Sequence, residues 1–170
     1  MSIAAVVLAA GEASRFGTPK QRLLLPEVLA RLERSPVDEI VVVAGAHTLE
    51  TPARVITCAG WKRGPGASLA SALDELGADV EAVVVVLADG PDLAPEAVER
   101  VFASWRSEGG PLVAASYRGA RGHPLLLARE AWEGIPDEGL RGRTARLVPC
   151  DDLGDPGDVN TPADLPERLR

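Results

Sequence analysis

The stretch that decides the fold lies near the start of the chain and reads Ile3-Ala4-Ala5-Val6-Val7-Leu8-Ala9-Ala10. It is apolar at every position and does not alternate with polar residues. A strand with one face in water alternates, whereas a strand buried on both faces is apolar throughout. We therefore expect a central strand in a sheet that is covered on both sides. Because the stretch lacks a basic lead-in and continues into Gly11-Glu12, we do not expect a secretory signal.

The rest of the chain alternates strand-like apolar runs with helical patterns. This alternation indicates crossover connections and a mostly parallel sheet. No linker-like tract divides the sequence, so we expect one doubly wound α/β domain over residues 1–170, with helices on both faces. The expected strands besides residues 3–10 are 39–44, 54–58, 82–88, 112–116, 124–127 and 145–149. The expected helices are residues 23–32, 68–76 (opened by Ser68), 94–105 and 162–169.

Composition argues against nucleic acid and membranes as partners and indicates the compartment. The net charge of −7 argues against nucleic acid, because affinity for a phosphate backbone comes from clustered Lys and Arg. No apolar run reaches the ~18 residues of a membrane-spanning helix, so no membrane partner is expected. Cys58 and Cys150 lie far apart without metal-site spacing, a usage that fits a reducing cytoplasm. We expect a cytoplasmic protein.

In doubly wound sheets, ligands bind outside the carboxyl ends of the strands. That rule selects the segments following Ala10, Ala44, Cys58, Ala88 and Ser116. Residues 11–20 read Gly11-Glu12-Ala13-Ser14-Arg15-Phe16-Gly17-Thr18-Pro19-Lys20. Gly11 lets backbone N–H groups approach a phosphate closely, and Arg15 and Lys20 supply positive charge. The segment matches neither a dinucleotide fingerprint nor a P-loop. The alternative is an ordinary flexible connection.

Asp89 ends the expected strand 82–88 and precedes the turn Gly90-Pro91. A carboxylate placed there can bind Mg²⁺, which favours oxygen ligands, or it can simply form a turn or cap a helix. Near the C-terminus, Thr161 and Pro162 indicate a helix start, with Thr161 as N-cap.

The segment Leu8 to Lys20 resembles the signature loop of the nucleotidyltransferases that include the molybdenum cofactor cytidylyltransferases and guanylyltransferases. Their pattern is Leu-Ala-(Ala/Gly)-Gly, three residues, Arg-(Phe/Met)-Gly and then Lys. The resemblance implies a Rossmann-like nucleotidyltransferase fold and a loop that wraps the triphosphate. The nucleotide-binding residues would then be Leu8, Ala9, Ala10, Gly11, Arg15 and Lys20, with Arg15, Lys20 and Asp89 as catalytic residues.

Further segments are similar to motifs of that family and follow the family order along the chain. Leu87-Ala88-Asp89-Gly90-Pro91 resembles its metal motif, and Asn160-Thr161-Pro162 resembles the element that supplies the second metal ligand. The resemblance thus implies that Asp89 and Asn160 hold Mg²⁺, with Asp158 nearby. Trp61 to Leu69 resembles an element that contacts the nucleobase and ribose through Ser68, although Ser68 can instead cap its helix.

Arg121-Gly122-His123-Pro124 resembles the acceptor-binding motif of the cytidylyltransferases. Residues 119–122 are expected to form a mobile, cationic turn, and a structural role for His123 remains the alternative. The stretch with Asp137 and Arg141 resembles a second acceptor element, except that Pro136 replaces a Gly. The acceptor-binding residues implied are Arg121, Gly122, His123, Asp137 and Arg141.

The resemblance implies a Mg²⁺-dependent enzyme that joins the nucleoside monophosphate of an NTP to a phosphorylated acceptor such as molybdopterin. A molybdoenzyme or chaperone would be a further partner. Ala10 favours CTP over GTP, whereas Asn160 and Gly64-Pro65 are closer to the guanylyl branch. Three alternatives stay open: transfer to a sugar phosphate or other acceptor, a small reductase, and a non-catalytic cofactor-binding relative. The short segments 23–43 and 46–58 favour the last.

Overall fold

Strand β1 (Ser2–Ala9) lies inside the sheet and pairs with a parallel strand on each side. In the computed structural model, which describes residues 2–11 and 20–170, Val6 stands opposite Val41 on one side and Val85 on the other. Successive residues of β1 face opposite layers of the core, and both layers are buried. This arrangement confirms the central strand and explains why its sequence does not alternate.

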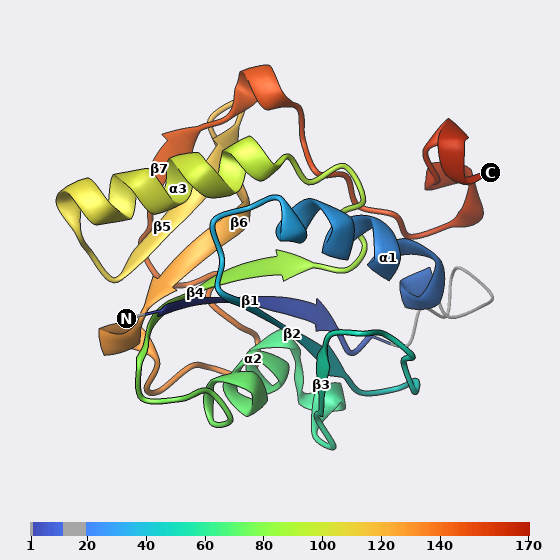
Figure 1. Cartoon of the computed structure of the whole chain (residues 1–170), viewed down its shortest axis with the longest axis horizontal. Coiled ribbons are helices and arrows are strands. Elements are labelled where there is room, and N and C mark those ends of the chain that lie inside the picture. The colour runs from blue at the N-terminus through green and yellow to red at the C-terminus, as the bar shows by residue number, and fades with distance from the viewer. Residues whose placement is uncertain (1, 12–19) are drawn as a thin grey trace.

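The described residues form a seven-stranded sheet in the order β3-β2-β1-β4-β6-β5-β7 (Figure 1). Neighbouring strands are parallel except where β6 pairs antiparallel with β4 and β5, so the sheet is mostly parallel as expected. The remaining strands are β2 (Glu39–Ala44), β3 (Arg54–Thr57), β4 (Val80–Leu87), β5 (Leu112–Tyr117), β6 (Ala120–Ala128) and β7 (Arg146–Pro149).

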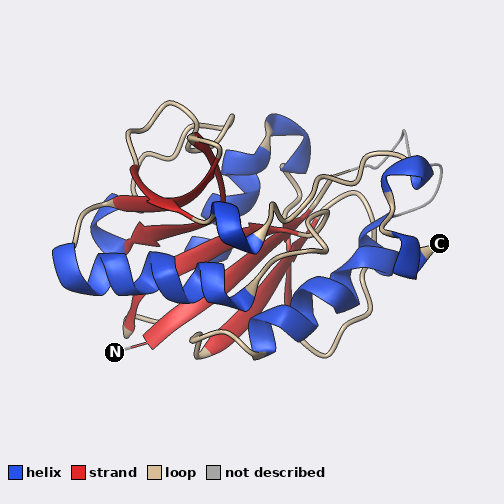
Figure 2. Ribbon diagram, turned by 90° about the horizontal axis from the view of Figure 1, so that it is seen from above, coloured by secondary structure: helices blue, strands red, loops and turns tan. Residues whose placement is uncertain are grey.

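Helices cover both faces of the sheet. Helices α1 (Lys20–Glu33) and α3 (Pro95–Glu108) pack on one face, and α2 (Pro65–Leu73) packs on the other (Figures 1 and 2). Leu25, Val28, Leu29 and Leu32 of α1 are all buried against the sheet, at the spacing of one helix face. The doubly wound α/β architecture is therefore confirmed. The structure has no helix long and apolar enough to cross a membrane within residues 2–11 and 20–170.

The C-terminal helix predicted over residues 162–169 is wrong. The segment forms two separate 3₁₀ turns, Pro162–Asp164 and Glu167–Leu169. Pro166 lies between them, and Leu165 before it has an extended ψ of 134°. Proline lacks the N–H that a continuous helix needs and disfavours helical geometry in the residue before it. The predicted start is correct, because Thr161 caps the first turn and Pro162 is its first residue.

Two other local predictions also need correction. Helix α2 begins at Pro65 rather than at Ser68, because Gly64 serves as N-cap and Pro65 has the backbone angle that a first helical position requires. Residues 120–122 do not form a mobile turn but belong to β6. The turn lies just before them, where Gly119 has a φ of +77° that an L-residue rarely adopts.

Candidate active site

The carboxyl ends of β1 and β4 lie side by side at one edge of the sheet. The backbone N–H of Ala88 donates to the Leu8 carbonyl at 3.1 Å, which places the end of β1, and Ala10-Gly11 after it, near Asp89. Leu8 and Ala9 themselves belong to β1, Ala10 is buried and Gly11 is exposed. This is the edge at which open α/β sheets bind their ligands.

Lys20, the first residue of α1, extends its side chain to this edge and is almost buried. Its ammonium donates to Asp89 Oδ2 at 3.2 Å, to Asn160 Oδ1 at 3.5 Å and to the carbonyl of Val159. Its side chain is 11% exposed and that of Asp89 is 21% exposed. Three residues that the sequence analysis assigned to catalysis or metal binding therefore meet at one point.

Asp89 has one carboxylate oxygen to spare. Its Oδ1 is buried and has no hydrogen-bond partner, whereas its Oδ2 accepts from Lys20. Burial raises the pKa of Asp89, the Lys20 ammonium opposes that rise, and the carboxylate of Asp158 adds to it. A buried carboxylate oxygen without a hydrogen-bond partner fits a hard divalent cation such as Mg²⁺, which prefers oxygen ligands. Within residues 2–11 and 20–170, no three His, Cys, Asp or Glu side chains are grouped to hold a metal by themselves.

Backbone hydrogen bonds and a small apolar cluster hold the segment around Asn160 against the Asp89 turn. The N–H of Val159 donates to the Asp89 carbonyl at 3.0 Å, and Val159 is buried with Leu24 of α1. Asp164 accepts from the backbone N–H groups of Asn160 and Thr161 at 3.1 and 2.9 Å. Asn160 is thereby both part of a capping motif and placed to offer its side-chain oxygen to a cation.

Ala10 packs against the end of β2. The N–H of Ala46 donates to the Ala10 carbonyl at 3.1 Å, and a Cβ added to Gly45 would lie 2.9 Å from the Ala10 Cβ. The same added Cβ would lie 2.6 Å from the Cβ of Trp61. Gly45 therefore lies between Ala10 and Trp61 and leaves no room for a side chain of its own. Sequence reasoning selected the segment after Ala44 by its strand end but assigned Gly45 no role.

The start of α2 meets the loop that carries Asp137. The N–H of Gly66 donates to the Asp137 carbonyl at 2.8 Å, and the Asp137 carboxylate lies 3.6 Å from the guanidinium of Arg63. Ser68 is buried in the first turns of α2 and Arg141 is exposed. A predicted nucleotide-binding element and a predicted acceptor-binding element are thus neighbours.

The predicted acceptor motif splits between two environments. Arg121 is directed to the loop, where its guanidinium donates to the carbonyls of Leu140 and Arg143 at 3.0 and 2.7 Å. Gly122 and His123 instead line a cavity of about 200 Å³ that is also bordered by Gly90 and Asp158.

The polar side chains that line this cavity include His123 and Tyr117 and the carboxylates of Asp155 and Asp158. Burial, with a smaller effect of the Arg121 charge, lowers the pKa of His123 to about 4, so its imidazole is neutral at pH 7. The Tyr117 hydroxyl donates to the His123 carbonyl at 2.8 Å. Tyr117 and Asp155 also line the cavity and were not predicted as site residues, although Tyr117 lies only four positions before the Arg121-Gly122-His123-Pro124 motif.

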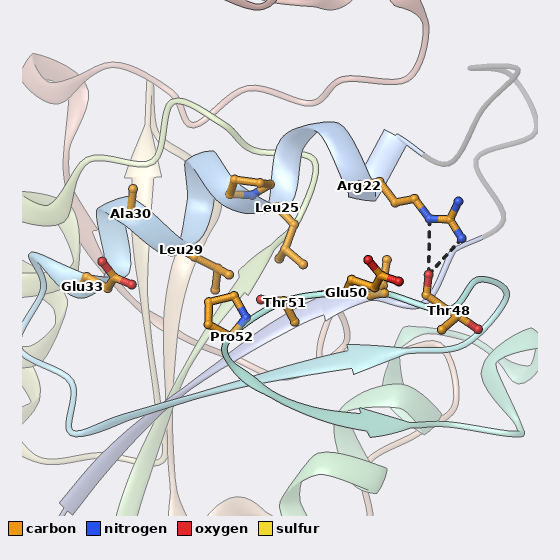
Figure 3. Close-up of a pocket in the computed structure, with 11 residues that line it drawn as sticks. Arg22, Leu25, Leu29, Ala30, Glu33, Thr48, Glu50, Thr51 and Pro52 are labelled. Carbon is orange, nitrogen blue, oxygen red and sulfur yellow. Dashed lines mark hydrogen bonds between the residues drawn. The ribbon is translucent and has the colours of Figure 1, made fainter.

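Arg15, a predicted nucleotide-binding and catalytic residue, lies outside the described residues. A larger cavity of about 730 Å³ lies between α1 and residues 48–52, where the Arg22 guanidinium donates to the Thr48 carbonyl (Figure 3). None of the predicted site residues within the described part of the chain lines this cavity.

Comparison with known proteins gives one family and a set of similar structures. The family described as MobA-like NTP transferase domain matches residues 5–148. A search of curated protein sequences gave no significant match.

The first similar structure is the homologue of Mycobacterium tuberculosis rv0371c from Mycobacterium sp. strain JC1. It is 28% identical with a TM-score of 0.77, over 95% of this chain and 92% of that one. Rv0371c from M. tuberculosis H37Rv is 26% identical with a TM-score of 0.78, over 96% and 95%. The structure of Rv0371c in complex with manganese is 24% identical with a TM-score of 0.68, over 97% of this chain and 93% of that one. With the family match spanning most of its length, this chain belongs to the MobA-like NTP transferase family and is a nucleotidyltransferase by fold and family.

Proposed function

We propose that the chain transfers the nucleoside monophosphate of an NTP, CTP in preference to GTP, to a phosphorylated acceptor of the molybdopterin type and releases pyrophosphate. The observation that carries this proposal is the meeting of Lys20, Asp89 and Asn160 at the edge of the sheet where β1 ends. Family membership supports an NTP as one substrate and a small molecule as the other.

The reaction needs charge and position more than proton transfer. A phosphate oxygen of the acceptor attacks the α-phosphorus in line, the bond to the bridging oxygen breaks, and its electron pair leaves with pyrophosphate. Lys20 would stabilise the negative charge on the α-phosphate, since fixed positive groups act there without reorganising. Arg15, assigned by sequence pattern alone, would hold the outer phosphates.

Asp89 and Asn160 would hold a Mg²⁺ ion, which would supply positive charge to the phosphates when bound. The unpartnered Oδ1 of Asp89 supports this assignment. A bound manganese ion in the structure of Rv0371c is a property of that protein, and it makes a divalent cation a reasonable choice here.

The acceptor would lie against Gly122 and His123, in the cavity that borders Gly90 and Asp158. The neutral imidazole of His123 can donate one hydrogen bond without adding charge. Arg121 would act indirectly, because its guanidinium already holds two carbonyls of the loop that carries Arg141. Base choice would rest on Ala10, whose methyl group narrows the space beside the base.

A pyrophosphate-release assay tests the proposal. The purified protein is incubated with Mg²⁺, each NTP in turn and each candidate acceptor, including molybdopterin and sugar phosphates. We expect release that requires both CTP and a molybdopterin-type acceptor. Release with a sugar phosphate alone would change the acceptor class, and no release with any pair would favour a non-catalytic relative.

A further inference from the structure

The ammonium group of Lys20 fills a slot made of three oxygen atoms. These are Asp89 Oδ2 at 3.2 Å, Asn160 Oδ1 at 3.5 Å and the carbonyl oxygen of Val159. An ammonium group has three donors and no acceptor, so it matches three oxygens in number. The slot is therefore a site for a cation, and it is built from α1, the turn after β4 and the C-terminal segment.

Two of these three oxygens belong to the proposed metal ligands, Asp89 and Asn160. Two cations cannot share the same small group of oxygens, because like charges a few ångströms apart repel strongly where water is excluded. We propose that Lys20 competes with the divalent metal for Asp89 and Asn160, so that Lys20 sets the metal affinity of the free protein. The competition rests on the geometry of the slot, and its link to the nucleotide rests on the proposed function.

The charges around the slot favour exchange of the lysine for a divalent ion. The carboxylate of Asp158 lies near Asp89, because the N–H of the next residue, Val159, donates to the Asp89 carbonyl, and the single charge of Lys20 can balance only one of the two carboxylates. Asp89 Oδ1 stays buried and unpartnered with the ammonium in place. A divalent ion would balance both carboxylates and engage the spare oxygen, whereas the ammonium satisfies neither need.

The lysine side chain is suited to leave the slot. Its ammonium is a compact, strongly hydrated charge on a flexible four-carbon stem. The phosphates of a bound NTP would offer it new oxygen partners on the same edge of the sheet. Metal and nucleotide would then strengthen each other's binding, because the nucleotide removes the competitor of the metal, and such coupling is reciprocal.

Binding of Mn²⁺ alone, followed by electron paramagnetic resonance, tests the competition without any turnover. Lys20→Met should bind Mn²⁺ at least about tenfold more tightly than the wild type, since one competing positive charge is removed. A merely damaged site would bind the metal more weakly, so the direction of the change is diagnostic. Lys62→Met is the matched control, because Lys62 is exposed and lies over the Trp61 ring. It should bind as the wild type does.

Lys20→Gln is a second variant in case the apolar Met side chain disturbs the buried slot, since its amide can still donate to Val159. Circular dichroism verifies the fold of both. Equal or weaker Mn²⁺ binding in the folded variants would overturn the proposal. Added CTP should raise the Mn²⁺ affinity of the wild type more than that of Lys20→Met, and an equal rise in both would also overturn the coupling. Failure of the proposed function would show separately, as absent pyrophosphate release with the Mn²⁺ result intact.

Discussion

The side-chain nitrogen of Lys20 lies 3.2 Å from a carboxylate oxygen of Asp89, although 69 positions separate the two residues in the sequence. Lys20 begins the helix that follows β1, and Asp89 follows β4, the parallel neighbour of β1. Their contact is a direct result of the sheet order.

Asp89→Ala should abolish turnover while the protein stays folded, because the side chain lies at a strand end and contributes to the proposed site rather than to the apolar core. Asn160→Ala should retain more activity, since a neutral ligand attracts a cation less strongly than a carboxylate does. Pyrophosphate release measures activity, and circular dichroism checks the fold. Near-normal Mg²⁺-dependent turnover in Asp89→Ala would remove Asp89 from the metal site.

Arg168→Met should lower kcat by about three- to tenfold with little change in Tm. The Arg168 guanidinium lies 2.8 Å from the Asp92 carboxylate, donates to the Pro91 carbonyl at 3.2 Å and lies 3.9 Å from Glu27 of α1. It thus connects the turn carrying Asp89 with the helix carrying Lys20. Partly exposed ion pairs contribute little to stability, so Tm should change little. The loss of kcat would come from a less exact placement of Asp89 and Lys20.

Arg168→Lys should recover part of the lost kcat, because it restores the charge without the full set of contacts. Arg54→Met is the control, since its ion pair with Glu75 (3.4 Å) joins β3 to the segment that follows α2, away from the site. The same kcat in Arg168→Met and in the control would mean that Arg168 does not position the site.

Because of His123, the free energy of unfolding should decrease as the pH falls from about 6.5 to about 4. Burial lowers its pKa to about 4 in the folded state, against 6.5 for an ordinary histidine. Between these values the unfolded chain binds a proton that the folded chain does not, so acid favours unfolding, and the effect is absent above this range.

His123→Gln should therefore unfold in urea with a weaker pH dependence than the wild type over that window. His47→Gln provides the control, because it leaves His123 in place. Parallel pH profiles of the wild type and His123→Gln would show that the imidazole is as accessible to protons in the folded state as in the unfolded state.

Ala10→Gly should shift nucleotide preference from CTP toward GTP by roughly 1–3 kcal/mol, the range that one methyl-sized difference in a pocket can supply. Ala10 is buried and packs against Gly45, so its methyl group is held in place at the edge of the proposed site. Competition of CTP and GTP in one pyrophosphate-release assay measures the shift. An unchanged preference in the variant would show that base choice lies elsewhere.

Local patterns of the sequence predicted the core strands and selected the strand ends that carry the proposed site residues. Residues 3–10 and 82–88 are apolar at every position because their strands pack against helices on both faces, and such a run has no other way to bury its surface. Strand-end turns are also local, so Asp89 and the Ala10-Gly11 turn could be placed at one edge before any coordinates. Ligands of open α/β sheets bind outside the carboxyl ends of the strands, and this rule applies without knowing which strands are neighbours.

Only the tertiary structure decided which of these residues meet. The contacts of Lys20 with Asp89 and Asn160 span 69 and 140 positions, and no local preference encodes contacts at that range. The same holds for Arg121, which the family resemblance assigned to acceptor binding but whose guanidinium donates to the backbone carbonyls of Leu140 and Arg143. Side chains near the end of a sheet choose partners by geometry and burial, which are properties of the packed chain. The sequence determines which residue types are available at the strand ends. Which of them contact each other is decided when distant segments fold onto the same edge of the sheet.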